Sequence, residues 1–207
     1  MQHKVVRNIG FYSSLCTTLF AIIYIIPQLI IGIDMPASKK DQFLILLPSL
    51  FLAPSFLIMM VSVHYLADPA RKIWSHIGIV FATAYFVFVS IVYFTVLTVT
   101  LPHILRGDST SVALIQYIPK SFLTGIDALG YTAMSLSTLF SAGIFVRRGL
   151  ESWLKWVFIL NGVIAPVILS TQIYPEMAYA GATWIITLPL SSILLAILFY
   201  RLKKQKK

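Results

Sequence analysis

Residues 43–67 read FLILLPSLFLAPSFLIMMVSVHYLA, a run of 25 residues without Asp, Glu, Lys or Arg. A helix of this length, at 1.5 Å per residue, measures about 37 Å and exceeds the ~30 Å of hydrocarbon in a bilayer. Pro48 and Pro54 lie inside the run. In water a mid-helix proline kinks or breaks a helix, whereas in a membrane neighbouring helices and hydroxyl groups satisfy the freed carbonyl. The stretch therefore predicts a bent membrane-spanning helix.

Comparable apolar runs follow one another along the chain. Of its 207 residues 58% are apolar and 11% charged, against about 25% charged residues in ordinary soluble domains. We expect one all-α domain over 1–207, a polytopic membrane helix bundle with proline-kinked spans and no soluble domain. Its six transmembrane helices are predicted at about 9–33, 43–67, 73–101, 121–146, 156–174 and 177–200.

Basic residues are divided unevenly between the two sides of this six-helix topology. Most of the sixteen Lys and Arg residues fall on the side that carries both termini. The positive-inside rule then places both termini in the cytoplasm, in a multi-pass protein of the cytoplasmic membrane. The net charge of +9 thus reflects topology, and the basic residues form no nucleic-acid-binding domain. The Lys-rich tail, 201–207, is also a candidate to contact anionic lipid, at about 1 kcal/mol per Lys.

The longest predicted connection, 102–120, contains an apolar segment. Residues 112–118 (VALIQYI) are too apolar for a free loop and too few to cross a bilayer. Two arrangements are open, a helix resting on lipid and a lid folded over the outer mouth of the bundle.

Small residues recur at four-residue spacing in three of the predicted helices. Such ridges let helix backbones approach closely in a membrane, within one chain or between membrane proteins. The ridge residues are Gly10, Ser14 and Thr18; Gly78 and Ala82; and Ala133, Ser137 and Ser141.

The polar residues inside the predicted spans are the candidates for ligand binding. Gln28, Asp127 and Gln172 fall at a similar depth in the outer third of three spans, and Thr95 and Thr98 reach the same level. These five residues define the predicted site.

Asp127 is the only carboxylate inside an apolar run. An intramembrane acid normally faces a bundle interior or a cavity, where it could carry a proton or hold a cation. It also lies within two turns of the predicted helix start, where interfacial water would hydrate it. Both placements, cavity and interface, are open.

A second polar group, His64, His76 and Asp68, flanks the predicted turn between the second and third spans. Two His and one Asp could bind a metal, but their spacing matches no established metal signature, so solvated or helix-end histidines are the favoured interpretation. Asn161, in the middle of the fifth span, is predicted to bond another helix. Catalytic motifs are absent from the sequence, and we expect neither an enzyme nor a cofactor.

Three segments carry a resemblance to known proteins: VYFTVLTVTLPHILRGD (92–108), LGYTAMSLSTLFSAG (129–143) and LESWLKWVFILNGV (150–163). The chain resembles a group of small bacterial six-helix membrane proteins without an assigned activity. The resemblance implies the same topology and a bacterial cytoplasmic membrane, and it supplies no ligand or catalytic residue.

Two classes of function follow from the sequence. The first is a transporter or membrane receptor for an apolar or cationic small molecule, with its site near Asp127. The second is an accessory protein that binds another membrane protein, or a second copy of itself, through the small-residue ridges. An intramembrane enzyme that uses His64 and His76 is a distant third.

Overall fold

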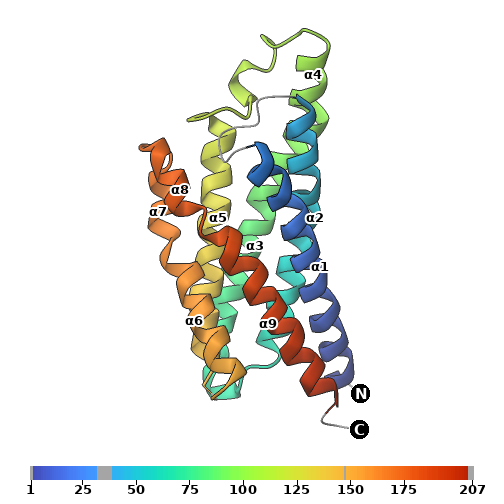
Figure 1. Cartoon of the computed structure of the whole chain (residues 1–207), viewed down its shortest axis with the longest axis vertical. Helices are drawn as coiled ribbons and strands as arrows, with labels where there is room; N and C mark the ends of the chain where they lie inside the picture. The colour runs from blue at the N-terminus through green and yellow to red at the C-terminus, as the bar shows by residue number, and fades with distance from the viewer. Residues whose placement is uncertain (1, 32–38, 147, 205–207) are drawn as a thin grey trace.

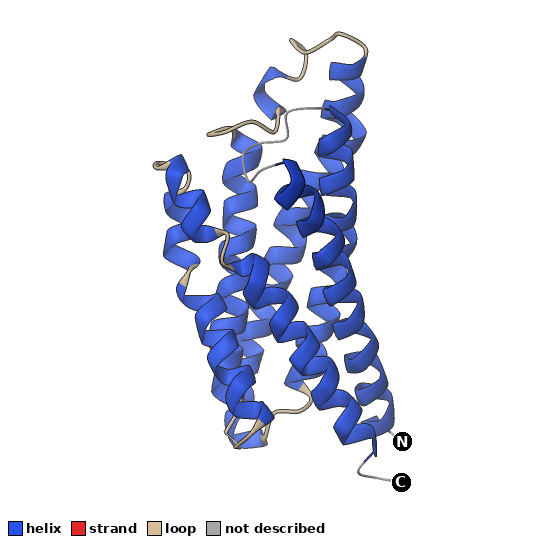
Figure 2. Cartoon of the chain, in the orientation of Figure 1, coloured by secondary structure: helices blue, strands red, loops and turns tan. Residues whose placement is uncertain are grey.

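The structure, a computed structural model, describes residues 2–31, 39–146 and 148–204 (Figure 1). These residues form helices and connecting segments, with no strand among them (Figure 2). The α-helices are α1 (Gln2–Ile31), α2 (Lys39–His64), α3 (Lys72–Thr95), α4 (Leu101–Leu105), α5 (Phe122–Ser141), α6 (Leu150–Val163), α7 (Ala165–Ser170), α8 (Ala178–Gly181) and α9 (Trp184–Lys204). A π-helical segment, η2 (Val96–Thr100), joins α3 to α4, and short 3-10 helices are η1 (Pro69–Arg71), η3 (Ala113–Ile115), η4 (Ala142–Ile144) and η5 (Pro175–Met177).

The long helices form a closed ring in the order α1, α2, α3, α5, α6 and α9. Each packs against the next, and α9 returns to α1. Helix α1 begins and α9 ends at the same end of the bundle, which we call the terminal end; the opposite end is the distal end (Figure 1). The level of Asn161, near the end of α6, separates a terminal half from a distal half.

Five helical segments among the described residues are long and apolar enough to cross a membrane: Lys4–Leu29, Phe43–His64, Pro69–Leu105, Leu150–Ser170 and Ala178–Lys204. They correspond to five of the six predicted spans. The remaining prediction, 121–146, contains α5, which is shorter and less apolar than expected. Most of α5 is buried against α3, α6 and α7. Its Ser and Thr side chains therefore face protein, where they are tolerated better than on a lipid-facing helix.

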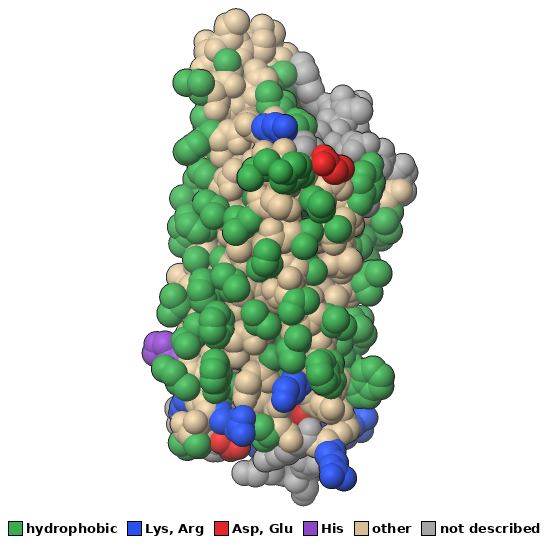
Figure 3. All heavy atoms as spheres, turned by 90° about the vertical axis from the view of Figure 1, so that its left-hand side faces the viewer, with side chains coloured by type: hydrophobic (Ala, Val, Ile, Leu, Met, Phe, Trp, Pro, Cys, Tyr) green, Lys and Arg blue, Asp and Glu red, His purple; other side chains and the backbone are tan. Residues whose placement is uncertain are grey.

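The surface agrees with a membrane protein. Hydrophobic side chains cover the middle of the face shown in Figure 3, and Lys and Arg side chains gather toward the terminal end. Many large apolar side chains are exposed, among them Leu29, Phe94 and Ile186. An apolar surface of this extent indicates contact with lipid or with another apolar surface.

Four of the five prolines in the predicted spans lie within continuous helices, and one lies at a helix break. Pro48 and Pro54 both lie within one continuous helix, α2, and Pro27 and Pro189 lie within α1 and α9. Only at Pro166 does a helix break, since α6 ends and α7 begins around Ile164. A membrane helix tolerates proline without a break where its surroundings satisfy the freed carbonyl.

The small-residue ridges lie inside the bundle. A Cβ atom on Gly10 would collide with the Phe199 ring, and one on Gly78 would meet Ser141 Oγ and the backbone of Ser137. Ser137 Oγ donates a hydrogen bond of 2.8 Å to the Gly78 carbonyl. The predicted use of these residues as close helix contacts is therefore confirmed within the chain.

Candidate functional site

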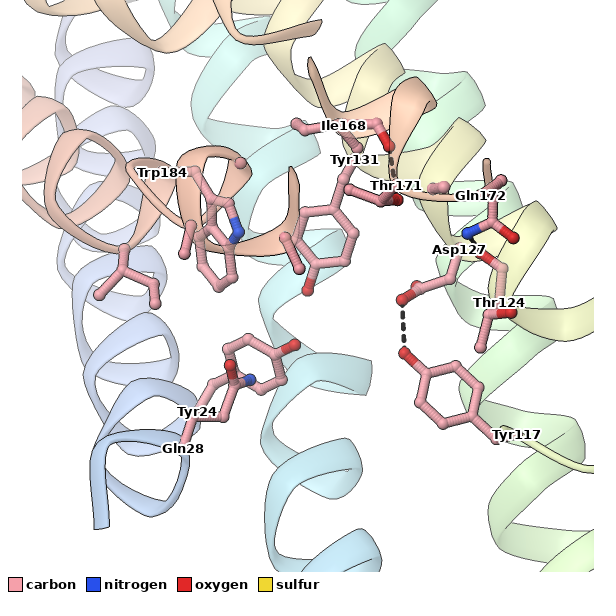
Figure 4. Close-up of a pocket in the computed structure, with 15 residues that line it drawn as sticks. Tyr24, Gln28, Tyr117, Thr124, Asp127, Tyr131, Ile168, Thr171, Gln172 and Trp184 are labelled. Carbon is pink, nitrogen blue, oxygen red and sulfur yellow. Dashed lines mark hydrogen bonds between the residues drawn. The ribbon is translucent and has the colours of Figure 1, made fainter. Parts of the chain in front are cut away.

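A cavity of about 190 Å³ lies in the distal half between α1, α5, α7, α8, the start of α9 and the segment 106–121 (Figure 4). We call it the distal cavity. Its volume is somewhat larger than a protein cavity of ~150 Å³ that holds benzene. The aromatic and polar residues that line it are Tyr24, Gln28, Tyr117, Thr124, Asp127, Tyr131, Thr171, Gln172 and Trp184.

Asp127 is the charged residue of this lining. It lies in the second turn of α5, and its side chain is buried, with 8% exposure. The Tyr117 hydroxyl donates a hydrogen bond of 2.6 Å to Asp127 Oδ2. Asp127 Oδ1 has no hydrogen-bond partner among the described residues. Asp127 thus lines the distal cavity.

The segment 106–121 brings Tyr117 to this carboxylate. Thr100 Oγ1, in the π-helical segment, donates a hydrogen bond of 2.9 Å to the Ile115 carbonyl, and Val112 is buried with 3% exposure. Leu114, between them, is 88% exposed. The segment thus folds over the distal side of the bundle, as the lid alternative predicts, and only one turn of it, η3, is helical.

Aromatic rings form the opposite wall of the distal cavity (Figure 4). The Trp184 ring centroid lies 5.4 Å from that of Tyr24 and 5.1 Å from that of Tyr131. Behind them, the Tyr131 and Tyr93 hydroxyls are 3.0 Å apart, within hydrogen-bond distance. Tyr24, Tyr131 and Trp184 are all buried, so contacts with neighbouring side chains fix the wall in place.

Three of the five predicted ligand-binding residues line the distal cavity: Gln28, Asp127 and Gln172. Gln172 Nε2 also donates a hydrogen bond of 3.2 Å to the Thr124 carbonyl. Thr95 and Thr98 are not part of the lining: Tyr93 of α3 and Val96 of η2 are buried in the bundle, whereas Thr98 of η2 is exposed. The Thr98 hydroxyl bonds the Phe94 carbonyl of its own helix, at 2.7 Å.

The aromatic residues were missed by sequence reasoning, although a signal for two of them was present. Tyr24 lies four residues before Gln28, and Tyr131 lies four residues after Asp127. Side chains four residues apart share a face of a helix. Each polar candidate therefore pointed to an aromatic neighbour on the same face.

His64, His76 and Asp68 do not form a metal site. The His64 and His76 ring centroids are 5.8 Å apart, and His64 Nδ1 lies 2.9 Å from Ser75 Oγ. Across the described residues, no three His, Cys, Asp or Glu side chains come close enough to hold a metal ion. Asp68 instead lines a second cavity, which we call the terminal cavity.

The terminal cavity has a volume of about 300 Å³ and lies where α1, α6 and α9 meet at the terminal end. Its lining carries both signs of charge, with Arg7 opposite the acids Asp68 and Glu151, and apolar side chains such as Phe145 and Leu202. Because both signs of charge line this cavity, its composition does not point to a ligand of one charge.

Asn161 has the role that the sequence predicts. Its Nδ2 donates a hydrogen bond of 2.9 Å to Thr138 Oγ1, and its Oδ1 accepts one of 2.6 Å from Thr187 Oγ1. The amide therefore joins α5, α6 and α9 and has no free atom for a ligand.

No family model, curated protein or solved structure matches this chain. The resemblance to small bacterial six-helix proteins stays a prediction. The function proposed next rests on the chemistry of the distal cavity.

Proposed function

We propose that this chain is a six-span protein of the cytoplasmic membrane that binds a small molecule in the distal cavity, as a transporter or a membrane receptor. The observation that carries the proposal is the buried Asp127 carboxylate, which lines the distal cavity and whose buried Oδ1 has no hydrogen-bond partner among the described residues. An ionisable group in this position is expensive in a membrane and commonly marks a substrate or ion pathway.

Helix α5 serves in this proposal as the sixth span. Its 20 residues, at 1.5 Å each, give a length of about 30 Å, which matches the hydrocarbon of a bilayer. Because α5 occupies one place in the closed ring, between α3 and α6, lipid need not contact its polar side chains.

Six spans place both ends of the chain on one side of the membrane, in agreement with their common position at the terminal end (Figure 1). Basic residues are concentrated on that side, so the terminal end would face the cytoplasm and the distal cavity the opposite side. Lys203 and Lys204 of the basic tail lie near aromatic rings, with Lys204 Nζ 4.8 Å from the Tyr200 centroid. Their proposed partner is anionic lipid; residues 205–207 lie outside the described residues.

The alternative function, an accessory protein that binds partners through its small-residue ridges, has less support. Gly10, Ser14, Gly78, Ala82 and Ser137 are all buried within the chain, in contacts between its own helices. Ridges used in this way present no surface to a second membrane protein. The proposal also includes no catalytic step.

A thermal-shift screen of the purified full chain in detergent, against metabolites, lipids and ions, tests the proposal. A ligand at 100 times its dissociation constant stabilises the folded state by about 2.7 kcal/mol. We expect at least one compound to raise the melting temperature of the wild type and of a matched control, Thr98→Ala, and not of Asp127→Asn. A response that Asp127→Asn retains would place the ligand elsewhere.

A further inference from the structure

We propose that the distal cavity takes a compact organic cation, with its ammonium group beside Asp127 and against the aromatic wall of Tyr24, Tyr131 and Trp184. This inference rests on the proposed function, that the cavity binds a small molecule, and it adds the chemical class of that molecule.

The charge of the lining points to a cation. Among the described residues, Asp127 is the one acidic residue that lines the cavity, and no Lys, Arg or His lines it. One carboxylate oxygen accepts the Tyr117 hydroxyl, and the other has no partner among the described residues. The buried side-chain atoms left unpartnered elsewhere in the described chain belong to neutral groups, on Asn8, Tyr85, Ser135 and Ser141. A buried carboxylate is stabilised by a paired positive charge, which a cationic ligand would supply.

The aromatic wall points to an organic cation. A cation is attracted to the face of a Trp or Tyr ring when it lies within about 6 Å of the ring centroid, and the attraction is strongest in a desolvated site. The Trp184, Tyr24 and Tyr131 rings are contiguous, with centroids 5.1 and 5.4 Å apart. In Figure 4 Trp184 and Tyr24 lie across the cavity from Asp127 and Tyr117, and Tyr131, one helical turn from Asp127 on α5, lies between them. A group between these two walls would contact the carboxylate on one side and rings on the other.

The size of the cavity limits the ligand. Its volume of about 190 Å³ is a little larger than a benzene-binding cavity of ~150 Å³. A trimethylammonium or small alkylammonium compound is of this order, whereas a long-chain lipid is much larger. The half-buried amides of Gln28 and Gln172, at the same cavity, could bond a hydroxyl group of such a ligand.

Anions and bare metal ions fit the cavity less well. The backbone N–H groups of Ile185, Ile186 and Thr187 at the start of α9 already donate to the carbonyls of Ala182 and Thr183, so they are not free for an anion. A divalent metal ion requires several oxygen ligands, commonly six to eight for calcium. The lining offers one carboxylate, and its remaining faces are largely aromatic and aliphatic.

Isothermal titration of the purified full chain tests the inference with two probes of the same shape. Choline carries a trimethylammonium group, and 3,3-dimethyl-1-butanol replaces its nitrogen by carbon and is neutral. We expect choline and tetramethylammonium to bind, and the neutral isostere to bind at least about tenfold more weakly, because it loses both the charge pairing and the cation–π attraction. Sodium and potassium at equal ionic strength should not compete.

A matched pair of variants at Tyr24 tests the aromatic wall without touching the carboxylate. Tyr24→Phe keeps the ring and should keep choline affinity within about threefold, whereas Tyr24→Leu removes it and should weaken binding about tenfold. Asp127→Asn should abolish binding. If Asp127→Asn fails to fold, the Tyr24 pair and the isostere comparison still decide the question.

Two results would overturn the inference. Equal binding of choline and its neutral isostere would show that charge is not recognised, and absence of binding by both cations would exclude the class. The proposed function would still hold after either result if the broader screen finds a neutral molecule whose binding is weakened by Tyr24→Leu. A screen without any cavity-dependent ligand would overturn both.

Discussion

The terminal and distal halves of this bundle use polar residues for opposite purposes. In the terminal half, Ser137 bonds the backbone of Gly78, and the small residues around it allow the helices to touch. At the boundary, each side of the Asn161 amide has a hydroxyl partner. In the distal half the helices are interrupted, at Ile164 and between α8 and α9, and the buried carboxylate oxygen Asp127 Oδ1 has no partner among the described residues, whereas the other unpartnered buried atoms there and elsewhere belong to neutral groups.

This difference separates structure from binding. A polar group with all its partners inside the protein stabilises the fold and has nothing left for a ligand. A buried group that lacks a partner costs stability until a ligand provides one, and the cost is largest for a charged group.

The first prediction concerns which half of the bundle faces which side of the membrane. Thiol labelling measures this, and its outcome is all or none. In a Cys16→Ser background, cysteine introduced at the exposed Ser109 of the distal end should react in intact cells with a membrane-impermeant thiol reagent. Cysteine at the exposed Ser152, near the start of α6, should react only after the membrane is permeabilised. Labelling of Ser152→Cys alone in intact cells would reverse the orientation and place the distal cavity on the cytoplasmic side.

The second prediction contrasts one glycine from each half. Gly78→Ala should lower the free energy of unfolding by about 2–3 kcal/mol, because the new Cβ meets Ser141 Oγ and lies 3.0 Å from the Ser137 carbonyl oxygen. Gly125→Ala is the matched change on α5: its nearest neighbour, Gln172 Oε1, is 3.8 Å from the new Cβ. That variant should be unchanged or up to about 1 kcal/mol more stable, because alanine favours the helix. Thermal unfolding in detergent measures both, and equal losses would show that the halves are packed alike.

Depth along the helices was predictable from sequence, and direction around each helix was not. The 1.5 Å rise places Gln28, Asp127 and Gln172 at one level, and all three line the distal cavity. The same rule included Thr95 and Thr98, and neither lines the cavity: Thr95 is half-buried and Thr98 is exposed. Only the packing of α3 against α5 decides which face points inward.

Tyr117 and Trp184 could not be found in this way. Tyr117 reaches Asp127 because the segment 106–121 folds back on itself, which depends on contacts such as that of Thr100 with Ile115. Trp184 is the first residue of α9 and follows a helix break at 182–183, where the sequence has no proline. In the fold, the order of helices was predictable from the apolar runs. The low apolarity of α5 was visible in its Ser and Thr residues, but only burial explains it.

The smallest expected effect concerns Asn161, which tests whether stability and binding are separate. Asn161→Leu leaves the Thr138 and Thr187 hydroxyls without their shared partner and should cost about 1 kcal/mol of unfolding free energy, the order of interhelical hydrogen bonds measured in membranes. Thr83→Ala is the control: its exposed hydroxyl bonds only the Ile79 carbonyl of its own helix, so the loss should stay below about 0.5 kcal/mol.

Choline affinity, measured by titration, should be unchanged in both variants, because neither residue lines the distal cavity. Asp127→Asn should give the opposite pattern, lost binding with little change in unfolding temperature. If Asn161→Leu abolished binding while the protein remained folded, the boundary layer would belong to the site, and the division into a structural half and a binding half would be wrong.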